Sequence, residues 1–136
     1  MKKYLFLLLF CAFPVFAKQL SLLEEAGQLG TVAGLAEVCG SKEKLKRYEF
    51  ISARLIANKA SSENEEMQGY QRYAEKKLQA KKMHQQSPKM TCGEIIKRFE
   101  KMPVLKSVVY KSGALKFYDG TYYPAKGIYT KKNNET

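Results

Sequence analysis

The chain has 136 residues, with 24 Lys and Arg against 13 Asp and Glu, and a formal net charge of +11. This length suits a single domain. With one histidine, one aspartate and no Gly-rich phosphate loop, the sequence offers neither a catalytic triad nor a nucleotide-binding signature. We therefore expect a non-enzymatic protein without catalytic residues or cofactors.

Residues 1–17 have the pattern of a signal peptide. Lys2 and Lys3 precede an uncharged apolar run, and Val15 and Ala17 occupy the small-residue positions of a cleavage site. The apolar run is shorter than the about 20 residues that a transmembrane helix needs. We predict export through a cleaved signal peptide to the periplasm or outside the cell, with an uncleaved anchor as the alternative.

The two cysteines that follow this signal, Cys39 and Cys92, predict a disulfide. Export would bring them to an oxidising compartment, where two thiols normally join. A zinc site would need both cysteines, His84 and a fourth ligand, so the disulfide is the simpler interpretation and no metal site is expected. A redox-active pair is disfavoured because the sequence has no Cys-x-x-Cys motif.

The first predicted helix spans about residues 20–39, with Ser21 as its N-cap. Three glycines lie along it, and their missing side chains indicate close approach of a neighbouring helix: Gly27, Gly30 and Gly34.

The second predicted helix spans about residues 42–59, with Ser41 as its N-cap. Apolar residues on two sides suggest a central position in the bundle, and Phe50 lies on the second side. The main inward face is Leu45, Tyr48, Ile51, Ser52, Leu55 and Ile56.

The third predicted helix spans about residues 63–83, with Ser62 as its N-cap. A narrow core stripe is expected at Met67, Tyr70, Ala74 and Leu78.

A fourth helix should begin after Thr91 and turn Ile95, Ile96, Phe99 and Met102 inward. Pro103 can start a further short helix over residues 104–111, and a strand over residues 108–110 is the competing interpretation.

Together these segments predict an all-α fold: a disulfide-closed up-down bundle of four or five helices over residues 18–113. In that topology the first helix ends where the fourth begins, which lets Cys39 reach Cys92. Residues 114–136 form an aromatic and basic tail, irregular or hairpin-like, in which Asp119-Gly120 indicates a turn. Its aromatic side chains that could contact a ligand are Tyr118, Tyr122 and Tyr123.

The positive charge is concentrated in the second half, where residues 76–136 carry 14 basic and 4 acidic side chains. This asymmetry indicates an anionic partner, although a merely solvated basic surface is the alternative. We expect phosphorylated lipid headgroups at a membrane surface, or else a polyanionic glycan. No specific nucleic-acid-binding motif is present, and a third possibility is a periplasmic accessory protein that docks a protein partner through a helical face. The expected anion-binding residues are Lys76, Lys77, Lys81, Lys82, Lys97, Arg98 and Lys101.

The sequence has a recognisable layout of three features. A leader comes first, Glu37-Val38-Cys39-Gly40 stands at one helix end, and Thr91-Cys92-Gly93-Glu94 follows some fifty residues later. Over about residues 18–113 the chain resembles small exported two-cysteine helical proteins of Gram-negative bacteria, some of which are substrates of type II secretion. The resemblance implies a secreted factor that acts at the surface or membranes of another cell. It assigns no catalytic residues, and the tail has no counterpart in it.

Overall fold

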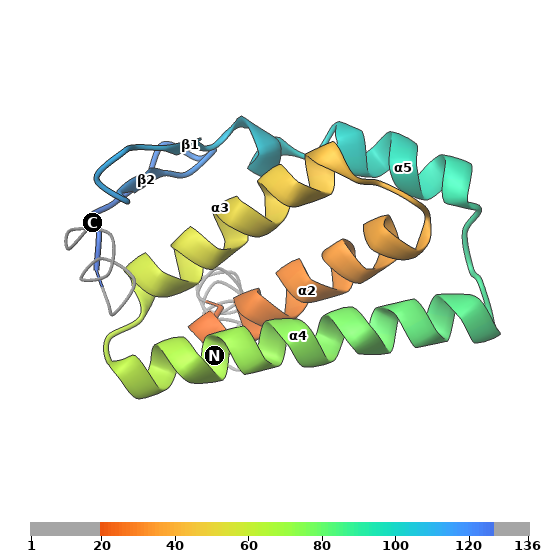
Figure 1. Cartoon of the computed structure of the whole chain (residues 1–136), viewed down its shortest axis with the longest axis horizontal. Helices are drawn as coiled ribbons and strands as arrows, with labels where there is room; N and C mark the ends of the chain where they lie inside the picture. Colours follow the sequence, from red (N-terminus) through yellow and green to blue (C-terminus); the bar gives the residue numbers. More distant parts are fainter. Residues whose placement is uncertain (1–19, 127–136) are drawn as a thin grey trace, which may run out of the picture.

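The computed structural model describes residues 20–126, and every structural statement below concerns this part of the chain (Figure 1). The predicted signal peptide lies outside the described residues. No helix within them is both long and apolar enough to cross a membrane. In chain order the elements are α2 (Leu22–Val38), α3 (Glu43–Lys59), α4 (Glu63–Gln86), α5 (Cys92–Glu100), the 3-10 helix η1 (Pro103–Lys106), β1 (Val108–Val109), β2 (Leu115–Lys116) and β3 (Tyr122–Tyr123).

Three of the four predicted N-caps are confirmed. The hydroxyl groups of Ser21, Ser62 and Thr91 each accept a hydrogen bond, at 3.1–3.2 Å, from the backbone N–H three residues further on. The prediction for α3 is wrong, because Lys42 occupies its N-cap and makes no side-chain capping bond. Ser41 instead belongs to the C-terminal stop of α2, where its N–H donates to the carbonyl oxygen of Ala36 at 2.9 Å.

The glycines of α2 allow unusually close packing against α4. A Cβ atom built on Gly30 would lie within 3.0 Å of the backbone carbonyl oxygen of Tyr73, and one on Gly34 would meet that of Lys77 in the same way. Since the numbers rise together on both helices, α2 and α4 run parallel, as the first and third helices of an up-down bundle do. The predicted close approach is confirmed, and α2 lies between α4 and the pair α3 and α5 (Figure 1).

The predicted disulfide is also confirmed. Cys39 follows α2 directly, Cys92 is the first residue of α5, and their sulfurs are bonded with the Cα atoms 5.1 Å apart. The bridge therefore joins one end of α2 to the start of α5, and it indicates a non-reducing compartment.

The expected core stripe of α4 is wrong at most of its positions. Met67 and Leu78 are each 52% exposed, and Ala74 is exposed as well. The buried residues of α4 are instead Glu66, Gly69 and Ala80. Gly69 packs against Ile56 of α3 and Ala80 lies beside Gly34 of α2, so both positions need small residues where a neighbouring helix comes close.

The expectation of an all-α fold holds only approximately, because the described chain contains a small sheet. Its strands are antiparallel in the order β1-β2-β3, with Val109 opposite Leu115 and Leu115 opposite Tyr123. The short helix predicted to start at Pro103 and run over residues 104–111 is present only as η1, which ends at Lys106, and β1 follows, as the competing interpretation proposed. Two β-branched valines suit a strand, and pairing with β2 decides the outcome.

The predicted turn at Asp119-Gly120 is confirmed. Gly120 has a φ of +89°, and its N–H donates to the carbonyl oxygen of Phe117 at 2.9 Å. The hairpin is held against α3, since Leu115 is fully buried and Phe117 almost so. Leu115 and Phe117 thus belong to the same core as Tyr48, Ile51, Leu55 and Phe99.

Candidate functional site

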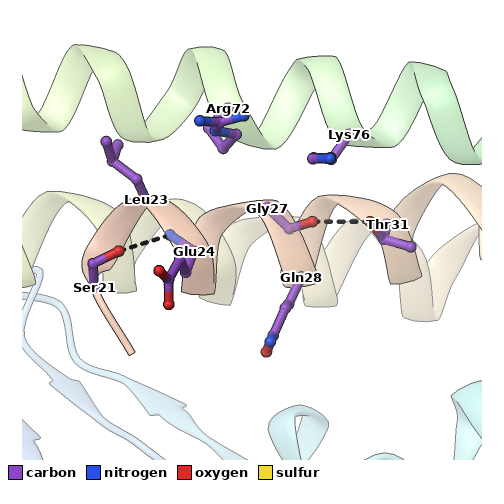
Figure 2. A pocket seen from close by; sticks show the side chains of 8 residues that line it. All are labelled: Ser21, Leu23, Glu24, Gly27, Gln28, Thr31, Arg72 and Lys76. Carbon is purple, nitrogen blue, oxygen red and sulfur yellow. Dashed lines mark hydrogen bonds between the residues drawn. The ribbon is translucent and has the colours of Figure 1, made fainter. Parts of the chain in front are cut away.

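A groove with a volume of about 620 Å³ runs along the contact of α2 and α4. Figure 2 shows Arg72 and Lys76 on α4 above the bare backbone of Gly27 on α2. The two cations are four residues apart and therefore lie one helical turn apart on the same side of α4. Gly27 is buried beneath these side chains, since a Cβ atom built on it would lie 3.4 Å from the Cγ atoms of Arg72 and Lys76.

The groove is positively charged at its α4 wall. None of the ion pairs between described residues involves Arg72 or Lys76, and Lys76 donates only to the side-chain oxygen of Gln79, at 3.3 Å. Glu24 also lines the groove, but Figure 2 shows its carboxylate pointing away from α4. The Thr31 hydroxyl donates to the Gly27 carbonyl oxygen at 3.0 Å and keeps that oxygen satisfied. The volume lies in the range of small-ligand sites.

Two of the predicted anion-binding lysines already have carboxylate partners. Lys77 lies 3.0 Å from a carboxylate oxygen of Glu49 and 3.5 Å from one of Glu37, and Lys81 lies 3.2 Å from Glu37. Desolvation opposes ionisation of Glu37, but the hydrogen bond and charge of Lys81 and the charge of Lys77 outweigh it and lower the pKa of Glu37. These lysines tie α4 to α2 and α3.

Four further predicted cations are exposed and belong to two different parts of the chain. Lys82 lies on α4, whereas Lys97, Arg98 and Lys101 lie on or just after α5. The exposed cations are thus divided between two helices.

The predicted aromatic contacts divide in a similar way. Tyr118 and Tyr122 are 50% and 59% exposed, while Tyr123 is half-buried against the core. Val108, Lys116 and Tyr122 face outward at paired positions of the sheet. The ring of Tyr110 lies 6.2 Å from that of Tyr122, which extends this exposed aromatic face.

The disulfide has an imidazole beside it. The Nε2 atom of His84 lies 3.8 Å from the sulfur of Cys39 and 3.6 Å from that of Cys92. These are the three side chains named above for a zinc site. Within the described residues they lie close enough together to hold a metal ion. The expected disulfide nevertheless occupies both sulfurs here.

Arg72 is the residue that sequence reasoning missed. The signal that could have found it is the combination of a glycine-lined helix with basic residues four apart on its partner helix. This combination points to Arg72 only once α2 is known to pack on α4 and not mainly on α3. No protein-family model matches this chain, and no similar protein was found among curated sequences or among solved structures.

Proposed function

We propose that this chain is an exported, non-enzymatic binding protein that engages phosphorylated lipid headgroups at an anionic membrane surface. The observation that carries the proposal is the pair Arg72 and Lys76, which line the groove on α4 and form no ion pair with a described residue. A guanidinium group binds phosphate oxygens in a bidentate manner, and a nearby ammonium group adds a second charge-assisted contact.

The outer face of α4 supports a membrane as the source of that headgroup. Met67 and Leu78 are about half exposed and lie eleven residues, or about three turns, apart on one side of the helix. Apolar side chains next to cations are the pattern by which helices lie at the bilayer interface. Lys82 continues the same helix as an exposed cation.

A polyanionic glycan is the second candidate ligand, and it has an observation of its own. The outward face of the sheet presents Tyr122 and Lys116 side by side, with Tyr110 against the Tyr122 ring. Exposed tyrosines can stack on sugar rings while a lysine contacts a sulfate or carboxylate group. This face lies on β2 and β3 and not on the groove, so the two candidates separate by mutation.

Vesicle binding tests the proposal. The purified protein should bind vesicles with phosphorylated anionic headgroups more tightly than neutral phosphatidylcholine vesicles, and raising the salt concentration should weaken binding because exposed charges become screened. Each cation near an anionic bilayer contributes about 1 kcal/mol, so the double variant Arg72→Gln/Lys76→Gln should bind roughly 30-fold more weakly.

A charge-matched control is the double variant Lys46→Gln/Lys106→Gln, which removes two exposed cations outside the groove. It should lose much less affinity than the groove variant. Equal losses would reduce the groove to a part of a general basic surface, and equal binding to neutral and anionic vesicles would exclude the headgroup. Binding to a sulfated polysaccharide that depends on Tyr122 and Lys116 would favour the glycan.

A further inference from the structure

Three potential metal ligands meet where α2, α4 and α5 come together. Cys39 ends α2, His84 lies in the last turns of α4, and Cys92 opens α5. Their ligand atoms all lie within 4.8 Å of one another. Because 45 residues separate Cys39 from His84, the fold, and not a local motif, creates this cluster.

We propose that reduction of the disulfide converts this cluster into a binding site for a thiophilic d10 cation, Zn²⁺ or Cu⁺, held by the two thiolates and Nε2 of His84. In a tetrahedral zinc site with usual bond lengths, a nitrogen and a sulfur ligand lie about 3.5 Å apart. The observed separations of 3.8 and 3.6 Å are close to that value. Only the two sulfurs need to move apart, from about 2 Å to about 3.8 Å.

The change of state balances with a dithiol reductant. The reductant gives up two electrons and two protons and becomes a disulfide, while the sulfur–sulfur bond of Cys39 and Cys92 breaks and each sulfur takes up one proton. Cation binding then displaces those protons from the thiols. Cys92 is exposed, so a reductant can reach it. As the first residue of α5 it also lies where the helix dipole favours a negative charge.

The surroundings favour a soft cation. An apolar cavity of about 280 Å³ adjoins His84, and its walls include Met83, Met90, Leu35 and Ile95. A water molecule in this space could complete four-coordinate Zn²⁺, whereas Cu⁺ accepts three ligands or adds a thioether. The proposal is independent of the anion-binding groove, which lies toward the other end of α2.

Metal titration of the full exported chain tests the site. The oxidised protein and protein reduced with a phosphine under anaerobic conditions are each titrated with Co²⁺ as a spectroscopic substitute for Zn²⁺, and with Cu⁺ in competition with a chromophoric chelator. We expect one cation per reduced chain, with the sulfur-to-cobalt charge-transfer bands of a thiolate site, and none for the oxidised chain. Equal binding by both forms, or no binding by the reduced form, would overturn the proposal.

His84→Ala separates the three-ligand site from a pair of free thiols. It should weaken binding by more than about 100-fold, because loss of a mere supporting residue already costs 10–100-fold. Gln85→Ala is the matched control on the next, exposed position of α4, and it should bind as the parent does. Unchanged affinity in His84→Ala would remove the imidazole from the site. If reduction alone unfolds the chain, circular dichroism tests the role of His84 instead. Adding the cation should then restore the helical signal of the parent but not that of His84→Ala.

Discussion

At the scale of single residues, two buried polar side chains differ in whether their polar atoms have hydrogen-bond partners. Asn58 is 1% exposed and fully used: its Nδ2 donates to the carbonyl oxygen of Gly113 at 2.8 Å, and its Oδ1 accepts from the N–H of Lys126 at 3.3 Å. Glu66 is 3% exposed, and its Oε1 has no hydrogen-bond partner within the described part of the chain. Asn58 thus fastens the sheet to α3, whereas Glu66 costs stability when it is charged.

Asn58→Asp should strongly destabilise the fold. The substitution replaces the donor to Gly113 with a negatively charged acceptor in a buried site, which costs about 3 kcal/mol. Denaturant unfolding measures the loss. Asn64→Asp is the control, because Asn64 is exposed in the first turn of α4, where an acid is favourable. If Asn58→Asp lowers the free energy of unfolding no more than Asn64→Asp does, the Asn58 contacts do not hold the sheet.

Glu66→Gln should stabilise the fold at neutral pH. Desolvation, and then the charge of Glu63, raises the pKa of Glu66 above 4.5, so folding favours its protonated form. The contribution of Glu66 to stability is therefore fully present below about pH 4.5 and is lost as pH rises through the folded-state pKa. The free energy of unfolding of Glu66→Gln should therefore increase relative to that of the parent as the pH rises, and denaturant unfolding from pH 4 to pH 7 measures this difference. Glu75→Gln controls for the loss of one exposed charge. If Glu66→Gln is less stable than the parent at pH 7, the charged form of Glu66 does not destabilise the fold.

At the scale of elements, the sequence predicted what local chemistry decides. Ser21, Ser62 and Thr91 cap helices through bonds to residues three positions away, and Asp119-Gly120 makes its turn within five residues. The buried side of α4 was not predictable in this way. It depends on two partner helices earlier in the chain, because Gly69 packs against Ile56 of α3 and Ala80 beside Gly34 of α2, while Met67 is left exposed.

The α2–α4 contact predicts contrasting effects for two neighbouring glycines. Gly30→Ala places a methyl group within 3.0 Å of a backbone carbonyl, which cannot yield unless α4 moves, so the free energy of unfolding should fall by about 2 kcal/mol. Gly27→Ala meets only the flexible side chains of Arg72 and Lys76, at 3.4 Å, and should gain up to about 1 kcal/mol from helix propensity. Thermal and denaturant unfolding compare the two. Equal effects would mean that the helices can separate without cost.

At the scale of the whole molecule, the sequence predicted the covalent link and the charge asymmetry but not the arrangement of the charges. The predicted export and the two thiols that follow the predicted signal peptide suffice to predict the bond between Cys39 and Cys92. Whether Lys77 is available to a ligand depends on Glu37 and Glu49, which reach it from two other helices. Arg72, by contrast, remains without an ion pair among the described residues and faces a groove that only the assembled helices form.

The disulfide and the groove should respond independently to mutation. The bridge closes a loop between residues 53 apart in sequence, so its removal in Cys39→Ser/Cys92→Ser should lower the free energy of unfolding by about 4 kcal/mol in the loop-entropy model. The groove is held by the contacts of Gly27 and Gly30 with α4, so anionic-vesicle binding should persist at temperatures where the variant remains folded. Denaturant unfolding and vesicle sedimentation on the same preparation measure both quantities. Loss of vesicle binding by a variant that retains its helical circular dichroism would mean that the headgroup site lies near the bridge, at the cations of α5, and not between α2 and α4.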